Sequence, residues 1–220
     1  MSTLTEAMQD YLKTMWHLAC ETGEPVSTTA LAEALGVAPA SVTNMLKRLA
    51  ELSLVEWEPY RGVVLTPAGE KIALEVIRHH RLIELYLAEA LGYSWDQVHE
   101  EAERLEHHIS EQFEAAIAEL LGHPTHDPHG DPIPTPDLQI VAIPTRPLTT
   151  LDPGHRGIVR RVANQEPETL RSLAEKGVRL GILVCMVKLN ADHQAVEVEI
   201  DGERVKLAWD LAQGIYVEPV

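Results

Sequence analysis

Apolar side chains recur every three or four residues over 4–22, which predicts an amphipathic helix that ends at Gly23. A second, short helix is predicted over 27–35, because its first residue, a serine, is a suitable N-cap. A third helix is predicted over 39–52, where the opening proline fits the first helical turn. The chain therefore begins with three helices, and a tight turn joins the last two.

The pattern then changes to short apolar runs separated by turn residues. Residues 54–57 are predicted to form a strand, 58–62 a turn and 63–65 a return strand. Two short helices joined by a tight turn and followed by a β-hairpin are typical of a winged helix-turn-helix. We assign residues 1–72 to a DNA-binding domain of that kind.

Two long helices follow the hairpin. The first is predicted to begin with Thr66 as its cap and Pro67 in its first turn, and to end near Gly92. The second is predicted over 94–121. One face of it carries an apolar stripe, which consists of Ile109, Phe113, Ala116 and Leu120. Because a helix this long must bury such a stripe, we expect residues 73–140 to form a helical domain that pairs with a second copy of the chain, giving a homodimer.

The last third of the chain has a β pattern. More than half of the 14 prolines fall in residues 122–153, which indicates a linker or an irregular wrapped segment. A short helix is predicted over 167–174, and Asp201-Gly202 is a hairpin signal. Strands are predicted over 158–162, 178–189, 196–200 and 205–207. Residues 141–220 therefore predict a small β-barrel, and the fold class is mainly α with a small β domain.

Composition narrows the class of protein. With 45% hydrophobic and 24% charged residues, the chain has a globular composition. No stretch approaches the roughly 20 apolar residues of a membrane helix, and the N-terminus lacks the basic start of a signal peptide, so we expect a cytoplasmic protein without a membrane role. The cysteines, Cys20 and Cys185, lie in apolar runs and are expected to be buried, reduced thiols.

The net charge of −16 argues against indiscriminate nucleic-acid binding, and the acid is concentrated in residues 73–140. In the winged module, the second of the paired helices would enter the major groove, where short polar side chains read bases and cations contact phosphates. The candidates for base contacts are Ser41, Thr43 and Asn44, and those for phosphate contacts are Lys47 and Arg48. At the hairpin tip, Tyr60 and Arg61 are candidates for backbone or minor-groove contacts. The alternative is a small hydrophobic core on which these are ordinary surface residues.

The segment HEEAERLEHH, residues 99–108, holds the densest candidate chemistry. Glu103, Glu106 and His107 fall at i, i+3 and i+4, which is one face of a helix, and His99 lies one turn earlier. Further candidate ligands are His80 and Glu84, also spaced i and i+4, and Asp10 on the first helix. An acidic, histidine-rich face favours a cation, and the alternative is a solvated acidic helix.

Two enzyme motifs are excluded by spacing. The zinc-protease motif needs histidine four residues after His99, where this chain has Glu103. Di-iron bundles need a glutamate three residues before a histidine, and no such pair occurs here. We expect five other histidines to lie outside any site: His79 and His108 on the surface, and His123, His126 and His129 in the linker.

Over nearly its whole length, the chain resembles the diphtheria toxin repressor and manganese transport regulator family. The β-rich C-terminus resembles the SH3-like domain of the longer members. The motifs that carry the resemblance, in this order, are YLKTMW, LAEALGVAPASVTNMLKRL, YRGVVLTPAGEKIA, HHRLIELYL, HEEAERLEHHIS and HGDPIP.

The resemblance implies two metal sites. Its primary site would consist of Asp10, Glu103, Glu106 and His107, and its ancillary site of His80, Glu84, His99 and Glu166, the last donated by the SH3-like domain. The next ligand position of the family falls on Thr169, a poor ligand, with Glu168 nearby.

Departures from the family pattern indicate the metal. Iron-responsive members carry methionine and cysteine where this chain has Asp10 and Glu103, and hard oxygen ligands suit Mn(II). Short manganese-type members carry a glutamate where this chain has Lys13, which argues against a binuclear pair.

The resemblance thus implies a manganese-dependent repressor of metal-uptake genes that binds double-stranded operator DNA. The close alternative is an Fe(II)-dependent regulator of the same fold, and other divalent transition metals are expected to bind in vitro. The distant alternative is a metal-binding enzyme or metal store with no role on DNA. The absence of a catalytic motif argues against an enzyme.

Overall fold

The structure, a computed structural model, describes residues 4–58, 61–141, 143–189 and 194–220. Tyr60, a predicted DNA contact, lies outside these residues. The chain divides into two compact units. The first comprises Met1–His79, Glu106–Ile109 and Pro134–Gln139, and the second comprises His80–Leu105, Ser110–Ile133 and Ile140–Val220.

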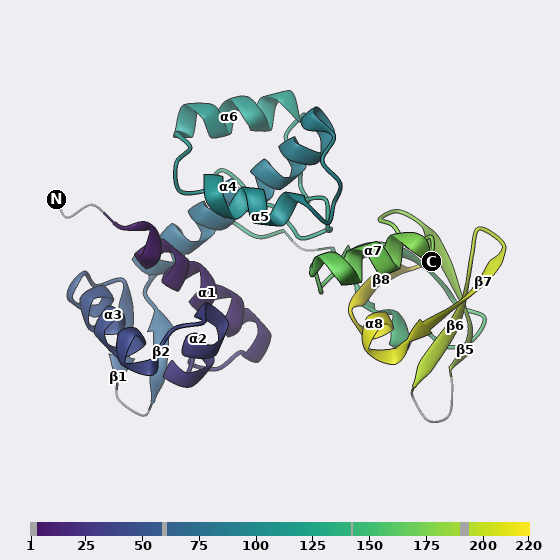
Figure 1. Ribbon diagram of the computed structural model, residues 1–220, viewed down its shortest axis with the longest axis horizontal. Helices are drawn as coiled ribbons and strands as arrows, with labels where there is room; N and C mark the ends of the chain where they lie inside the picture. The colour runs from purple at the N-terminus through teal and green to yellow at the C-terminus, as the bar shows by residue number, and fades with distance from the viewer. Residues whose placement is uncertain (1–3, 59–60, 142, 190–193) are drawn as a thin grey trace. The chain divides into compact units, whose positions relative to one another are not determined.

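The first unit contains the predicted helices and hairpin (Figure 1). Its elements are α1 (Glu6–Thr22), α2 (Thr28–Leu35), α3 (Pro39–Glu51), β1 (Val55–Glu58) and β2 (Gly62–Leu65). The hairpin strands are antiparallel, with Val55 opposite Leu65. Leu12, Leu31 and Leu46 are completely buried in the core that joins the helices to the hairpin.

Helix α4 (Pro67–Leu91) begins as predicted, since the Thr66 hydroxyl accepts a hydrogen bond from the Gly69 amide at 3.1 Å. The helix predicted over 94–121 is wrong as a single element. It is two helices, α5 (Val98–Leu105) and α6 (Glu111–Leu120). The Ser110 hydroxyl accepts from the Phe113 amide at 3.3 Å and caps α6, so the chain turns between the two helices.

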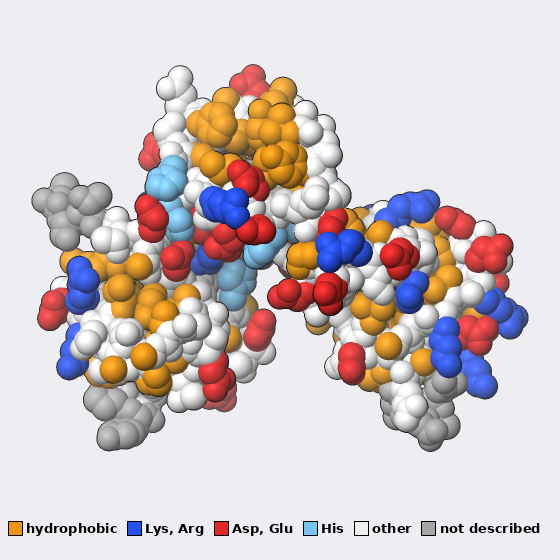
Figure 2. Space-filling view, viewed as in Figure 1, with side chains coloured by type: hydrophobic (Ala, Val, Ile, Leu, Met, Phe, Trp, Pro, Cys, Tyr) orange, Lys and Arg blue, Asp and Glu red, His pale blue; other side chains and the backbone are white. Residues whose placement is uncertain are grey.

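This break has two consequences. Glu106 and His107 lie in the turn after α5, so the prediction that they share one helical face with Glu103 is wrong. In addition, Phe113 and Leu120 of the predicted apolar stripe are 47% and 67% exposed on α6. Figure 2 shows hydrophobic side chains gathered on this helix.

The second unit ends in a six-stranded antiparallel sheet of order β3-β8-β4-β5-β6-β7. Its strands are β3 (Arg146–Pro147), β4 (Arg156–Val162), β5 (Leu183–Leu189), β6 (Ala195–Ile200), β7 (Glu203–Ala208) and β8 (Ile215–Pro219). The accompanying helices are η1 (Leu148–Thr150), α7 (Pro167–Glu175) and α8 (Trp209–Gln213). The strand predicted from residue 178 begins at Leu183, and the sequence pattern missed α8 and β8.

The proline-rich segment is wrapped rather than loose. Within the first unit Arg78 donates to the Pro134 carbonyl, and within the second Arg81 donates to the Pro132 carbonyl, both at 2.6 Å. Cys20 is exposed and Cys185 half-buried, so the expectation of two buried thiols is wrong, although neither described cysteine forms a disulfide. None of the helices in the described part of the chain has the length and apolar character needed to cross a membrane.

The cap of α2 gives a direct test of this local structure. The Ser27 hydroxyl accepts from the Ala30 amide at 3.0 Å, so Ser27→Ala should lower the free energy of unfolding by about 1 kcal/mol. Thr29→Ala, on the exposed face of the same helix, is the control and should leave stability unchanged or slightly raised. Urea denaturation of both variants checks this; equal stabilities would contradict the cap.

Candidate metal centres

The first cluster consists of Asp10 from α1 with Glu106 and His107 from the turn after α5, all within the first unit. The His107 Nε2 atom lies 2.8 Å from Asp10 Oδ1 and 3.3 Å from Glu106 Oε1. Glu106 is completely buried, whereas Asp10 and His107 are half-buried. Two carboxylates and one imidazole thus converge on one point, as the residues of a divalent-metal site do.

Two further residues orient this cluster. The Gln9 side-chain oxygen lies 2.7 Å from His107 Nδ1 and accepts a hydrogen bond from it. In the neutral ring the proton is then on Nδ1, and Nε2 can bind a ligand. The His79 Nδ1 atom lies 3.1 Å from the Glu106 carbonyl oxygen and donates to it, holding the turn. His79 is buried, so the prediction that it lies on the surface is wrong. Gln9 was not singled out from the sequence, because its spacing carries no ligand signal.

Lys13 supplies a resident positive charge. Its Nζ atom donates to Glu106 Oε1 at 2.6 Å, and both side chains are buried. A buried carboxylate is costly unless it is paired, so Lys13 balances the charge of Glu106 in the first cluster.

The second cluster consists of His80 on α4 with His99 and Glu103 on α5. Glu103 Oε1 lies 3.8 Å from a ring nitrogen of each histidine. Glu84 adjoins it, since its Oε1 atom lies 2.9 Å from His80 Nε2 and 3.1 Å from His99 Nδ1. The structure therefore brings Glu103 together with the predicted ancillary residues. Its assignment to the Asp10 site stays a prediction.

The third cluster, Glu84 with Asp127 and His129, was missed by the sequence analysis. All three residues are buried, and His129 Nδ1 lies 3.6 Å from Glu84 Oε2. The interpretation of His129 as a linker residue is wrong, because it is completely buried. The sequence signal that could have revealed it is the short spacing of Asp127 and His129, which flank the proline just before the HGDPIP motif.

The geometry of His129 fits a metal ligand. Its Nε2 atom donates to the Trp95 carbonyl oxygen at 2.7 Å, so the proton of the neutral ring is on Nε2. The buried Nδ1 atom has no hydrogen-bond partner among the described residues, and its 3.6 Å separation from Glu84 is too long for a hydrogen bond. A nitrogen lone pair facing two carboxylates suits a divalent cation.

Electrostatics differ among the buried carboxylates. Burial raises the pKa of Glu84, but attraction to His80, hydrogen bonds from His80 and His99 and the proximity of His129 outweigh it and hold this pKa well below its usual range. Burial, with repulsion from Glu84 and Asp131, raises the pKa of Asp127 to about 7. The hydrogen bond to Asp10, together with the charges of Glu106 and Asp10, raises the pKa of His107 despite its burial.

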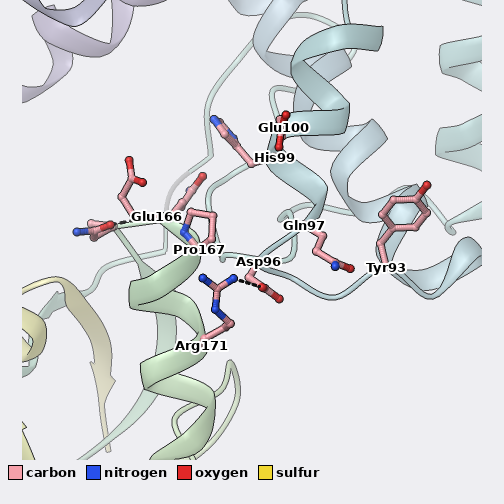
Figure 3. A pocket seen from close by; sticks show the side chains of 11 residues that line it. Tyr93, Asp96, Gln97, His99, Glu100, Glu166, Pro167 and Arg171 are labelled. Atoms are coloured by element: carbon pink, nitrogen blue, oxygen red, sulfur yellow. Dashed lines mark hydrogen bonds and ion pairs between the residues drawn. The ribbon is translucent and has the colours of Figure 1, made fainter.

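Glu166, the ligand expected from the C-terminal domain, is exposed and precedes α7 as its N-cap residue. It lines a cavity of about 920 Å³ together with His99 and Arg171 (Figure 3). Arg171 forms an ion pair with Asp96 at 2.9 Å across this cavity. Glu168 is exposed and Thr169 half-buried on α7. The role of Glu166 as a ligand stays a prediction.

The predicted DNA contacts lie on α3 and the hairpin. Ser41, Asn44, Lys47 and Arg48 are exposed on α3. The Thr43 hydroxyl donates to the Pro39 carbonyl at 3.1 Å, so this side chain is engaged by its own helix. Arg61 is exposed, and its Nη1 atom lies 3.1 Å from Glu58 Oε2.

Profiles of known families match three stretches of the chain. The N-terminal DNA-binding domain of the iron-dependent repressors matches residues 3–63. The metal-binding and dimerisation domain of the same repressors matches 66–135, and the FeoA domain matches 146–219.

Relatives agree with these profiles. The diphtheria toxin repressor of Corynebacterium efficiens is 29% identical over 100% of this chain and 98% of its own length. The transcriptional regulator MntR of Salmonella typhimurium is 40% identical over 49% of this chain and 67% of its own. A solved manganese-dependent transcriptional repressor in complex with manganese superposes with a TM-score of 0.89 at 38% identity, covering 97% of this chain and 100% of that one.

These relatives are transcriptional repressors and not enzymes. Their family binds operator DNA and dimerises. The chain belongs to the iron-dependent repressor family of metal-dependent transcriptional repressors.

Proposed function

We propose that this chain is a manganese-responsive repressor that binds operator DNA as a homodimer in the cytoplasm and controls genes of metal-ion uptake. The observation that carries the choice of metal is the donor set. The first cluster offers two carboxylates and an imidazole, and the other two clusters add only carboxylates and imidazoles. Hard carboxylate oxygens suit Mn(II), and no thiolate among these donors favours a softer ion.

The first cluster is proposed as the regulatory site, with Glu103 as an additional ligand by family resemblance. Asp10 lies on α1, which packs within the DNA-binding unit, and Glu106 and His107 lie in a separate segment of chain. A bound ion supplies positive charge between these carboxylates. Asp10 and the turn are then held together more firmly than by the His107–Asp10 hydrogen bond alone. This would fix the position of α1 and, through it, of the recognition helix.

The histidine-rich centre around Glu84 is proposed as the ancillary site. Glu84 contacts His80 and His99 through one oxygen and faces His129 with the other. His80, Glu84, His99 and, by resemblance, Glu166 are its expected ligands, and Asp127 and His129 join them on geometric grounds.

The exposed apolar face of α6 is proposed as part of the dimer interface. Phe113 and Leu120 are large exposed hydrophobic side chains on this helix, which lies in the region matched by the dimerisation profile. A dimer presents two copies of α3. Ser41 and Asn44 are proposed to read bases, while Lys47, Arg48 and Arg61 contact the backbone. Thr43 and Tyr60 remain candidates from the sequence alone.

A second candidate is an Fe(II)-responsive regulator, favoured by the names of the two matched iron-dependent repressor profiles. Anaerobic calorimetric titration with Mn(II) and with Fe(II) separates the two. The manganese proposal requires that Mn(II) activate DNA binding at the free Mn(II) concentrations found in cells. Glu103→Cys should shift the order of metal affinities toward Fe(II).

Metal-dependent DNA binding is the first prediction of this proposal. In a gel shift on operator DNA, Mn(II) should raise the affinity of the chain by roughly 5- to 150-fold, a usual range for coupled ligands. Asp10→Asn should abolish this increase. Glu6→Gln, on the same helix and exposed, is the control and should retain it. Equal DNA binding with and without Mn(II) would rule the proposal out.

Lys13 should set the metal concentration to which the first cluster responds. Lys13→Met removes a positive charge 2.6 Å from a ligand oxygen, so Mn(II) affinity should rise roughly tenfold or more. The metal-free variant should lose about 3–5 kcal/mol of stability, because the buried Glu106 carboxylate no longer has the Lys13 charge beside it. Calorimetry and urea denaturation measure both effects, with the exposed Lys71→Met as control. An unchanged affinity would mean that Lys13 does not compete with the ion.

Metal affinity should also depend on pH. His107 must lose the proton on Nε2 to bind an ion, and its raised pKa keeps that proton in place to higher pH than in a free histidine. Affinity for Mn(II) should therefore fall as the pH drops through this raised pKa, by up to about tenfold per pH unit for one proton, and level off above it. Titrations between about pH 6 and pH 8.5 test this; an affinity independent of pH over that range would contradict it.

A further inference from the structure

The segment 127–131, here called the ligand loop, carries two of the three members of the third cluster. It lies directly against β4 of the C-terminal sheet. The Val162 amide donates to the His129 carbonyl oxygen at 2.9 Å, which adds the loop to the strand. At Gly130 the contact is closer still. A Cβ atom there would lie 1.9 Å from the Arg160 carbonyl oxygen, and the backbone has a φ of +88°.

Asp131 fixes the other end of the ligand loop. Gln165 donates from Nε2 to Asp131 Oδ2 at 2.7 Å, and Arg161 Nε lies 3.2 Å from Asp131 Oδ1. The Arg161 contact is an ion pair without hydrogen-bond alignment. Both partners belong to the region matched by the FeoA profile.

These contacts reach the ligand atoms. Asp127 Oδ1 accepts from the backbone amides of His129 at 2.8 Å and Asp131 at 2.9 Å. One carboxylate oxygen of Asp127 therefore closes the loop, and the other is left for the cluster and for Arg81, whose Nε lies 3.7 Å away.

Trp95 also holds His129 in place. Its carbonyl oxygen accepts from His129 Nε2, and its ring stacks on the imidazole with centroids 6.3 Å apart. The same side chain packs against the hydrophobic core of the C-terminal sheet. The orientation of His129 thus depends on the sheet domain as well as on the loop.

We infer that the C-terminal sheet domain is a positioning part of the third cluster: it fixes Asp127 and His129 as metal ligands by gripping the ligand loop between β4 and Trp95. This inference rests on the proposed function, because it takes the cluster to be a metal site. The domain acts through the backbone and through Asp131, independently of whether Glu166 donates a ligand. By linkage, an ion at the cluster and the packing of the loop on β4 stabilise each other to the same degree.

Two glycines provide a matched test. Gly130→Ala places a methyl group against the Arg160 carbonyl and should push the ligand loop off β4. Gly154→Ala is the control, because Gly154 has a φ of +85° but nothing within 4 Å of its Cβ position. In calorimetric titration of the full chain with Mn(II), Gly130→Ala should weaken one binding step by roughly 10- to 100-fold, the usual effect of losing an outer support of a ligand. The step that Asp10→Asn removes should stay unchanged.

A second pair keeps the test valid if Gly130→Ala fails to fold. Arg161→Met with Gln165→Leu removes the grip on Asp131 and should weaken the same step. Arg160→Met is the control, since Arg160 pairs with Glu218 on β8 instead. Hydrogen exchange at the Val162 amide gives an independent readout. It should slow on addition of Mn(II) in the unmodified chain, and the double variant should lose this response.

The outcomes distinguish the proposed metal site from the proposed positioning role of the sheet domain. If the unmodified chain shows a metal step at the third cluster and both altered proteins retain it at full affinity, the grip plays no part and the inference is overturned. If the unmodified chain shows no such step, the metal site itself is wrong and the inference falls with it. A weakened step in the altered proteins, with both controls unchanged, supports it.

Discussion

Two buried glutamates, Glu84 and Glu106, impose the constraint on which the rest of the structure depends. Removing a carboxylate from water costs several kcal/mol unless partners compensate for the lost hydration. Lys13 and His107 surround Glu106, and three histidines surround Glu84. The chain therefore keeps negative charge inside the protein and balances it with groups that a divalent ion can partly replace.

This constraint explains local features that would otherwise be unrelated. The end of α5 at Leu105 releases Glu106 and His107 into a turn, where they meet Asp10 of α1. His79 donates to the Glu106 carbonyl, and Gln9 orients the His107 ring. On α4, His80 and Glu84 point into the centre that the ligand loop completes. The first and third clusters each combine one buried glutamate with side chains from segments that are distant in sequence.

The helices, caps and hairpin of the first unit could be predicted from sequence, because hydrophobic spacing and capping residues are local signals. Gly23, Ser27 and Thr66 act at the positions expected of them. The break before α6 was missed because helical periodicity continues across it, although Ser110 is a good N-cap. The spacing of acidic residues and histidines also predicted candidate ligands, but it did not predict which of them form one cluster. The meeting of Asp10 with His107 was expected from family resemblance rather than from local pattern.

The third cluster shows where sequence reasoning stopped. Proline and glycine in residues 127–131 suggested a linker or an irregular wrapped segment, and nothing local shows that the loop lies against β4. His129 contacts Trp95 and Asp127 contacts Arg81, each more than thirty positions away, and composition and periodicity do not encode such contacts. The exposure of Cys20 had the same cause, since an apolar neighbourhood in sequence did not become one in space.

The most direct test of the central claim is anomalous diffraction at the manganese absorption edge, on crystals of the chain grown with Mn(II). The account predicts a peak within coordination distance of Asp10, Glu106 and His107, and a second beside Glu84, Asp127 and His129. A loaded crystal whose manganese peaks all lie away from Asp10 and Glu106 would contradict it.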